Sequence, residues 1–226
     1  MKKLLILGFL FIFNWPQLFA QEKFVDDASL WLGLQLEKKV NKKMQLQFSN
    51  QIRYDRNLSR YRMGYQDLGL EYHVFKLLYV QADYKFIHRQ LLDESFSYRH
   101  QMNLSFLLKK KFGSWIFTYK NRWQWQYNDV NSSADGFIPQ VVNRNKLSVK
   151  YALDKRIKFF GSGELNYILK PAKDESWDRY RTSMGLEYQL NRNSSLELYY
   201  TFQRDLETDI ETERFHIYGL TYSIKL

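Results

Sequence analysis

Four histidines could serve as bases near neutral pH, and a base is the first requirement of a hydrolytic site. A nucleophilic serine two residues farther on would lie on the same face of a strand. His100 is followed by Gln101 and Met102, and none of the four histidines has a serine or threonine at that spacing. The pattern therefore predicts no catalytic residue and favours histidines that hydrogen-bond to their surroundings. They are His73, His88, His100 and His216.

No metal site or cofactor is predicted. The histidines are widely spaced, no His-x-His pair occurs, and the chain has no cysteine that could supply a thiolate ligand or a disulfide. An alternating acidic stretch could attract calcium, which prefers carboxylate oxygens. A solvated acidic loop is the interpretation that we favour for it. The stretch comprises Asp205, Glu207, Asp209, Glu211 and Glu213.

In many segments of the chain every second residue is apolar, and charged side chains gather at the positions between them. Basic residues outnumber acidic ones on this face, and an excess of guanidinium groups along a narrow passage would favour anions. The alternative is a closed interior in which the charges pair with one another and with glutamine and tyrosine. The residues predicted to line this face are Arg53, Arg62, Glu71, Asp83, Lys85, Arg99, Lys120, Arg122, Lys150, Lys158, Glu164, Arg179, Arg181, Glu187 and Glu197.

These residues must be positioned by strands, because the dominant signal after residue 27 is an alternation with a period of two. In the first segment Leu30, Leu32 and Leu34 share one face, while Trp31 and Gly33 share the other. Residues 61–67 run out of phase with 68–74, which predicts a β-bulge or aromatic side chains turned inward. Eleven segments carry the alternation: 30–37, 44–54, 61–74, 78–87, 96–108, 115–127, 145–153, 157–169, 180–190, 196–203 and 214–226.

The connections between these segments alternate in length. Short turns are expected at 75–77, 154–156 and 191–194, and longer polar loops at 55–60, 88–95, 128–143, 170–178 and 205–213. Short turns at one end and long loops at the other are typical of bacterial transmembrane barrels. A weak repeat supports consecutive hairpins, because Met-Gly-Leu-Glu-Tyr at 184–188 echoes Leu-Gly-Leu-Glu-Tyr at 68–72.

The number of segments indicates which face looks outward. A soluble barrel of this size would enclose an apolar interior wider than side chains can fill, because about eight strands already reach that limit. Lipid against the apolar face removes the difficulty, and a closed barrel pairs every backbone polar group. Aromatic residues form 18% of the chain, and many lie near segment ends, where interfacial girdles would place them. A soluble, secreted two-sheet sandwich is the alternative.

We therefore expect an all-β, antiparallel, up-and-down transmembrane β-barrel of about 10–12 strands. The alternation continues to Leu226 and is similar to the terminal strand by which the outer-membrane assembly machinery recognises barrels. Single-chain bacterial barrels have even strand numbers. Although eleven segments are visible, this rule favours twelve strands, with the missing one hidden in 21–29 or one segment misread.

An export signal precedes the strands. Lys2 and Lys3 come before an apolar run over 4–13, and Ala20 precedes the expected cleavage point. The run has about ten residues, too few for a spanning helix, which needs about twenty. We expect a cleaved signal peptide over 1–20 and one barrel domain over 21–226 in a Gram-negative bacterium. Removal of the signal peptide, with its two lysines, leaves 32 of the 34 basic residues and 24 acidic ones, a net charge of +8. No nucleic-acid-binding motif accompanies this charge.

Several short motifs resemble a known family. They are Trp31, a first hairpin that ends at Arg53, Arg-Tyr-Arg at 60–62 and 179–181, Gly-Leu-Glu-Tyr at 69–72 and 185–188, and the terminal Tyr-Ser-Ile-Lys-Leu. In these features the chain resembles the exported barrels catalogued as domain of unknown function 2490, over nearly its whole mature length. The resemblance implies an outer-membrane barrel without an assigned activity and carries over no catalytic residue.

Functionally, we expect an outer-membrane protein that acts as a narrow anion-favouring channel or as a non-conducting envelope component. A lipid-modifying enzyme that uses His100 is the alternative from a different class. The expected partners are outer-membrane lipid and lipopolysaccharide, the assembly machinery through the C-terminal strand, and small anionic solutes. Nucleic acid is not expected as a partner.

Overall fold

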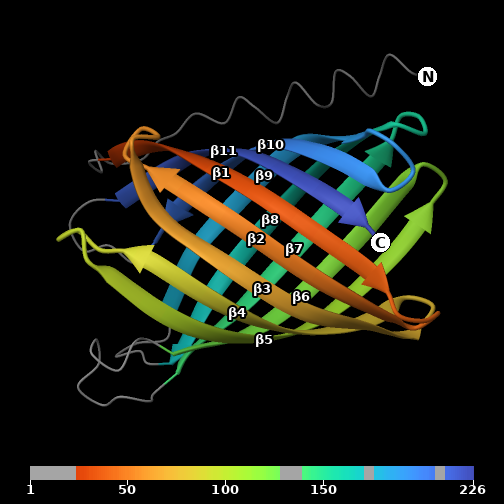
Figure 1. Cartoon of the computed structure of the whole chain (residues 1–226), viewed down its shortest axis with the longest axis horizontal. Coiled ribbons are helices and arrows are strands. Elements are labelled where there is room, and N and C mark those ends of the chain that lie inside the picture. The colour runs from red at the N-terminus through yellow and green to blue at the C-terminus, as the bar shows by residue number, and fades with distance from the viewer. Residues whose placement is uncertain (1–23, 128–138, 171–175, 207–211) are drawn as a thin grey trace.

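The computed structural model describes residues 24–127, 139–170, 176–206 and 212–226, which form a single closed β-barrel (Figure 1). No helix in these ranges is long and apolar enough to cross a membrane. The predicted signal peptide lies outside the described residues. The strands are β1 (Phe24–Lys39), β2 (Met44–Asp55), β3 (Arg60–Phe75), β4 (Leu78–Gln90), β5 (Phe96–Phe112), β6 (Trp115–Tyr127), β7 (Gln140–Ala152), β8 (Ile157–Lys170), β9 (Ser176–Gln189), β10 (Ser194–Asp205) and β11 (Thr212–Lys225).

The all-β barrel and its eleven alternating segments are confirmed. Each strand pairs antiparallel with the next along the chain, so the barrel is a series of consecutive hairpins. The two-sheet sandwich is wrong, because β1 and β11 pair with each other and close the wall. Closure gives every strand two neighbours and leaves no free sheet edge.

The preference for twelve strands is also wrong. In the described residues β1 begins at Phe24 and takes up the segment in which a further strand could have hidden. β1 and β11 run parallel, with Phe24 opposite Thr212 and Glu37 opposite Lys225. A parallel pair satisfies its backbone groups as an antiparallel pair does, with slanted instead of perpendicular hydrogen bonds. An odd number of strands can therefore close without an unpaired edge.

The connections divide into two ends. The turn end holds the short connections 40–43, 76–77, 113–114, 153–156 and 190–193, and the loop end holds the connections after β2, β4, β6, β8 and β10. At the loop end, the carboxylate of Asp27 accepts hydrogen bonds from the amides of Arg56 and Asn57 at 3.1 and 2.8 Å. Arg56, Asn57 and Leu58 all have positive φ angles. Asp27 thus ties β1 to a tight turn in an unusual backbone conformation.

The phase change over 61–67 has both of the causes offered for it. The pairing of β2 with β3 shifts where Arg53 lies opposite Met63 but Tyr54 lies opposite Tyr61, so one residue of β3 is extra. Beyond the bulge Tyr65 points inward, with its ring centre 5.3 Å from the guanidinium of Arg53. The shift lets aromatic side chains occupy both sides of one strand.

Candidate functional site

The barrel wall carries apolar side chains on its outer face and polar side chains on its inner face, which is the reverse of a soluble protein. Leu68, Met184 and Leu147 on the outer face are 57–60% exposed. Gln101 and Asn103 on the inner face are 4% exposed. A soluble domain places apolar side chains inside and polar ones outside. The interior of this barrel is therefore its polar compartment and the place to look for a site.

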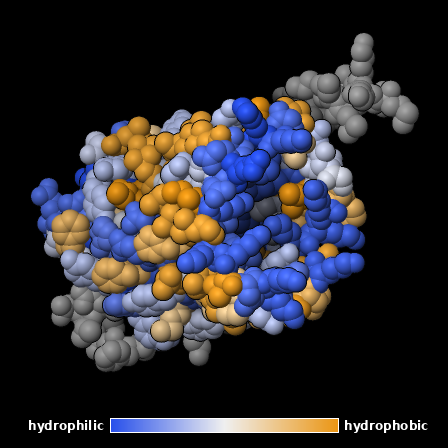
Figure 2. Space-filling model, turned by 45° about the vertical axis from the view of Figure 1, so that its right-hand side comes forward, coloured by the Kyte–Doolittle hydropathy of each residue, from blue (hydrophilic) through white to orange (hydrophobic). Residues whose placement is uncertain are grey.

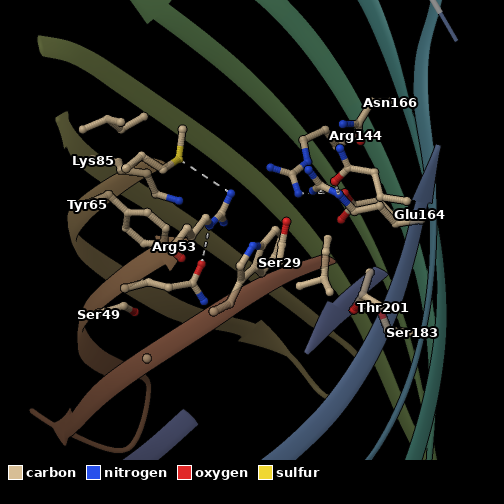
Figure 3. Close-up of a pocket in the computed structure, with 18 of the residues that line it drawn as sticks. Ser29, Ser49, Arg53, Tyr65, Lys85, Arg144, Glu164, Asn166, Ser183 and Thr201 are labelled. Atoms are coloured by element: carbon tan, nitrogen blue, oxygen red, sulfur yellow. Dashed lines mark hydrogen bonds and ion pairs between the residues drawn. The ribbon is translucent and has the colours of Figure 1, made fainter. Parts of the chain in front are cut away.

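The structure places the sequence-predicted residues on this inner face and brings most of them together. A cavity of about 540 Å³ fills much of the interior (Figure 3). Nine of the predicted residues line it: Arg53, Arg62, Lys85, Arg99, Arg122, Glu164, Arg179, Arg181 and Glu197. The others lie on the same face outside this cavity: Glu71, Asp83, Lys120, Lys150, Lys158 and Glu187.

Ion pairs hold one side of the interior. Glu164 on β8 accepts hydrogen bonds from Arg144 of β7 at 2.7 Å and from Arg181 of β9 at 3.1 Å. Figure 3 shows Arg144 and Glu164 facing each other on this side of the cavity. Nearby, Arg122 lies 3.2 Å from the carboxylate of Asp83, whose side chain is fully buried. These pairs fix side chains of the four neighbouring strands β6 to β9 and of β4, which lies beyond β5.

A second cluster lies toward the turn end. Glu187 accepts hydrogen bonds from Lys150 at 3.0 Å and from Lys158 at 2.6 Å. On the adjoining part of the wall, Lys120 of β6 donates to Gln81 of β4 at 2.7 Å. In this region, charges and amides satisfy one another, as the closed-interior alternative supposes.

Aromatic rings position the cations on the other side of the cavity. The guanidinium of Arg53 lies 3.7 Å from the ring centre of Trp31, and the ammonium of Lys85 lies 4.1 Å from that of Tyr65. Arg53 also donates to Gln51 at 2.7 Å. Cation–π contacts orient a charge without neutralising it. Arg53 therefore keeps its full positive charge toward the cavity.

Three arginines near this side form no ion pair with a carboxylate in the described part of the chain: Arg53, Arg89 and Arg99. The buried Nε of Arg99 and the Oγ of Ser97 also have no hydrogen-bond partner there. Arg89 lies on β4 opposite Ser97 of β5, and Arg99 is two residues farther along β5 on the same face. A buried polar atom without a partner costs free energy unless a ligand or water satisfies it. This part of the wall is therefore prepared to receive an acceptor.

The cavity carries a surplus of positive charge. Its acidic lining residues are three, Glu164, Asp178 and Glu197. Its basic lining residues are ten: Arg53, Arg62, Lys85, Arg89, Arg99, Arg122, Arg144, Lys146, Arg179 and Arg181. Four of the ten, Arg62, Lys85, Arg122 and Arg179, also contact carboxylates outside the lining, those of Asp55, Asp67, Asp83 and Asp205. The surplus that remains produces a positive potential inside a low-dielectric wall. The arrangement can attract and hold anions.

Sequence reasoning missed three of these basic residues. Arg89 fell in an expected loop and Arg144 just before an expected strand, but β4 and β7 extend past the expected strand ends and carry both inward. Lys146 lies within an expected strand, on the same parity as Lys150. Continuing the alternation outward would have found Arg89 and Arg144, and applying it throughout 145–153 would have found Lys146.

The histidines do not assemble a hydrolytic site. His100 and His216 accept from or donate to the hydroxyls of Tyr84 and Tyr200 at 2.6 Å, and both lie on the outer face. His88 likewise contacts Tyr61, and His73 stacks on Tyr79. No serine or threonine is among their hydrogen-bond partners in the described residues. The described residues also hold no group of side chains suited to a metal ion, and the acidic stretch lies largely outside them.

Fold and interior together define a class: a closed β-barrel with an apolar outer face and a charged, hollow interior. The chain belongs to the family described as protein of unknown function (DUF2490), whose model matches residues 28–213. The resemblance drawn from the sequence is thereby confirmed. A search of curated proteins returned no match.

Three solved structures share limited similarity with the chain. The β domain of the Bordetella autotransporter BrkA is 9% identical, with 78% of this chain and 82% of that chain covered and a TM-score of 0.43. A structure from work on in-meso crystallization of membrane proteins is 10% identical, with 83% and 79% covered and a TM-score of 0.39. The siderophore receptor PirA from Pseudomonas aeruginosa is 8% identical, with a TM-score of 0.33. There 79% of this chain matches 35% of that chain.

Proposed function

We propose that this protein spans the bacterial outer membrane and that its lumen conducts small anions. The observation that carries the proposal is the cavity, in which ten basic and three acidic side chains line one polar interior. Conduction and membrane placement are separate steps, and each has its own support and test.

The outer face supports membrane placement. Its exposed side chains are large and apolar along the wall, as with Leu198 at 54% and Met102 at 54%. Aromatic side chains lie near strand ends, including Trp115 at 47% and Trp177 at 52% exposed. A soluble protein seldom exposes so continuous an apolar surface, whereas lipid requires one. Export by the expected signal peptide would deliver the barrel to the outer membrane, where spanning barrels reside.

Membrane placement predicts two behaviours of the expressed protein. It should remain in the membrane pellet after an alkaline carbonate wash, because its apolar belt is buried in lipid. The unboiled protein should also migrate differently from the boiled protein on a detergent gel, because a closed barrel resists unfolding. Recovery in the soluble periplasmic fraction, with one mobility before and after boiling, would contradict the proposal.

The interior supports passage of anions. Figure 2, in which the turn end comes forward, shows a hollow bordered by hydrophilic side chains. The cavity lining runs from Gln35 and Phe160 toward the turn end to Asp178 and Arg179 toward the loop end. Charge that lines a passage selects against ions of the same sign. The arginines without carboxylate partners would supply most of this selection, since their charge is not compensated.

The test is ion selectivity in planar bilayers. Under a KCl gradient, the parent protein should give a reversal potential with the same sign as the equilibrium potential of chloride. The Arg89→Gln/Arg99→Gln double variant should shift it toward zero, because neither arginine has a carboxylate partner whose charge would be left behind. Arg56→Gln/Lys110→Gln is the matched control, since it removes two exposed charges outside the cavity lining and should change little.

Two results would overturn the channel proposal. A parent protein without conductance would mean that the paired charges close the lumen, which would leave the barrel a non-conducting envelope component. A cation preference, or an equal shift in the control variant, would show that the lining charge does not set selectivity.

A further inference from the structure

The turn end of the barrel is surrounded by positive charge that the lumen does not use. Twelve basic residues there are all exposed. We call these residues the turn-end collar. They are Lys38, Lys39, Lys42, Lys43, Lys76, Lys109, Lys110, Lys111, Lys155, Arg156, Arg192 and Lys225.

The collar is not neutralised by the protein. None of its members forms an ion pair among the described residues. Asp154 is the only acidic residue in the five turns, and it is committed to its own turn. Its carboxylate accepts from the amides of Arg156 and Ile157 at 2.6 and 2.7 Å, and these bonds hold the pKa of Asp154 below its ordinary value. Glu37, in the strand end beside the first turn, accepts a hydrogen bond from Gln35 on the inner face. The twelve cations are therefore exposed at the rim without an ion-paired counter-charge in the described residues.

The collar surrounds the barrel instead of forming a patch on one side. Each of the five turns, or a strand end beside it, contributes at least one member, and β11 contributes Lys225. A compact soluble partner would select one side of the rim. A ring of charge around one end fits a planar anionic layer through which a cylinder passes.

An aromatic row lies directly beside the collar on the outer face. Phe75, Phe112 and Trp115 are 57, 53 and 47% exposed, and the ring of Trp115 packs 4.6 Å from that of Tyr151. The ammonium of Lys110 lies 4.6 Å from the ring centre of Phe112. Aromatic rings favour the headgroup level of a bilayer, and lysine stems extend from there toward water. The aromatic row and the basic collar thus follow each other in the order found at a membrane interface, with the rings toward the lipid and the lysines toward water.

The loop end is different. Its exposed charged side chains in the described connections and strand starts include Asp26, Asp93 and Glu94, against Arg56. Charge is therefore distributed unequally along the barrel axis. Whatever the collar binds lies on one side of the membrane only.

We propose that the turn-end collar binds the phosphate groups of anionic phospholipids in the leaflet that surrounds the turn end. The inference rests on the proposed membrane placement but not on conduction. Short turns face the periplasm in bacterial barrels, so this leaflet would be the inner, phospholipid leaflet of the outer membrane. Lysines close to an anionic surface each strengthen attachment, and the attraction is screened by salt.

The experiment compares lipids retained by the folded barrel. Protein reconstituted in nanodiscs of equal phosphatidylglycerol and phosphatidylcholine is released into detergent, and the lipids that stay bound are counted by native mass spectrometry. We expect phosphatidylglycerol to be retained at least about fivefold over phosphatidylcholine, with the preference falling at high salt. The Lys109→Gln/Lys110→Gln/Lys111→Gln variant should lose much of the preference, and the same three positions changed to arginine should keep it. Arg56→Gln, at the loop end, is the control that should leave it unchanged.

The outcomes separate this inference from the membrane proposal. A barrel that inserts into phosphatidylcholine alone but retains both lipids equally would overturn the collar and leave membrane placement standing. A barrel that inserts into neither lipid would overturn both. Stronger retention of added lipopolysaccharide than of phosphatidylglycerol would also contradict the assignment, because it would place the turn end in the other leaflet.

Discussion

Replacing Glu164 by glutamine should destabilise the folded barrel by about 3–5 kcal/mol, the range found when one partner of a buried ion pair is removed. Glu164 is the only acidic side chain in contact with both Arg144 and Arg181 in the described residues, at 2.7 and 3.1 Å. The side chains of the three residues are between 11 and 21% exposed. The glutamine can still accept a hydrogen bond, but two buried guanidinium groups would lose their counter-charge. Urea unfolding in lipid vesicles, followed by tryptophan fluorescence, measures the loss.

Glu197→Gln is the matched control for this prediction. Glu197 also lies inside the barrel, but its carboxylate is 3.8 Å from Lys150 and its side chain is 31% exposed. Loss of such a pair should cost about 1 kcal/mol or less. Equal costs for the two variants would show that the network around Glu164 contributes nothing special. The Glu164 variant should also strengthen any preference for anions, because it raises the positive surplus of the cavity.

Substitution of Gly219 should damage the closing strand. Tyr199 of β10 is paired with Gly219 of β11, and its ring lies over the glycine. A Cβ at Gly219 would lie 2.0 Å from this ring. The ring occupies the space of the missing side chain, as when an aromatic residue covers a glycine in a designed barrel. Gly219→Ala should cost about 1–3 kcal/mol, because the ring must leave its rotamer. Urea unfolding in lipid vesicles, followed by tryptophan fluorescence, measures this loss of stability as well.

The chain supplies both a control and a rescue. Gly163 of β8 has no atom within 4 Å of its ideal Cβ, so Gly163→Ala should have little effect or stabilise slightly. Tyr199→Ala removes the obstructing ring, so Gly219→Ala should cost far less in that background. A Gly219 variant as stable as the parent, or additive effects in the double variant, would contradict the packing argument.

The wall of the barrel was predictable because its physics is local. The alternation of Trp115, Phe117 and Tyr119 with Ile116 and Thr118 is read directly from neighbouring residues, and lipid on one side keeps the pattern clean. The same parity identified the inner face, which holds every charged residue expected there.

Closure and pairing were not predictable in the same way. Whether β1 meets β11 in parallel depends on contacts between residues nearly 190 positions apart, such as Asp26 and Arg214, which no local pattern reveals. Parity places Arg53 and Arg181 on one face, but only the register shows that Arg181 has a carboxylate partner and Arg53 has aromatic neighbours. The distinction decides which charges are available to a ligand.

The parallel seam between β1 and β11 limits how the chain can be rearranged. In a barrel with an even number of strands the termini are neighbours at one end, so a short linker can join them. Here the chain enters the wall beside Thr212 and leaves it at Lys225, and 14 paired positions separate the two ends of the seam. A linker between the termini would have to span about 45 Å at about 3.3 Å per residue, through the lumen or along the wall. Circular permutants of this barrel should therefore need a strand-long insertion, and proteins fused to its two termini should be displayed at opposite ends.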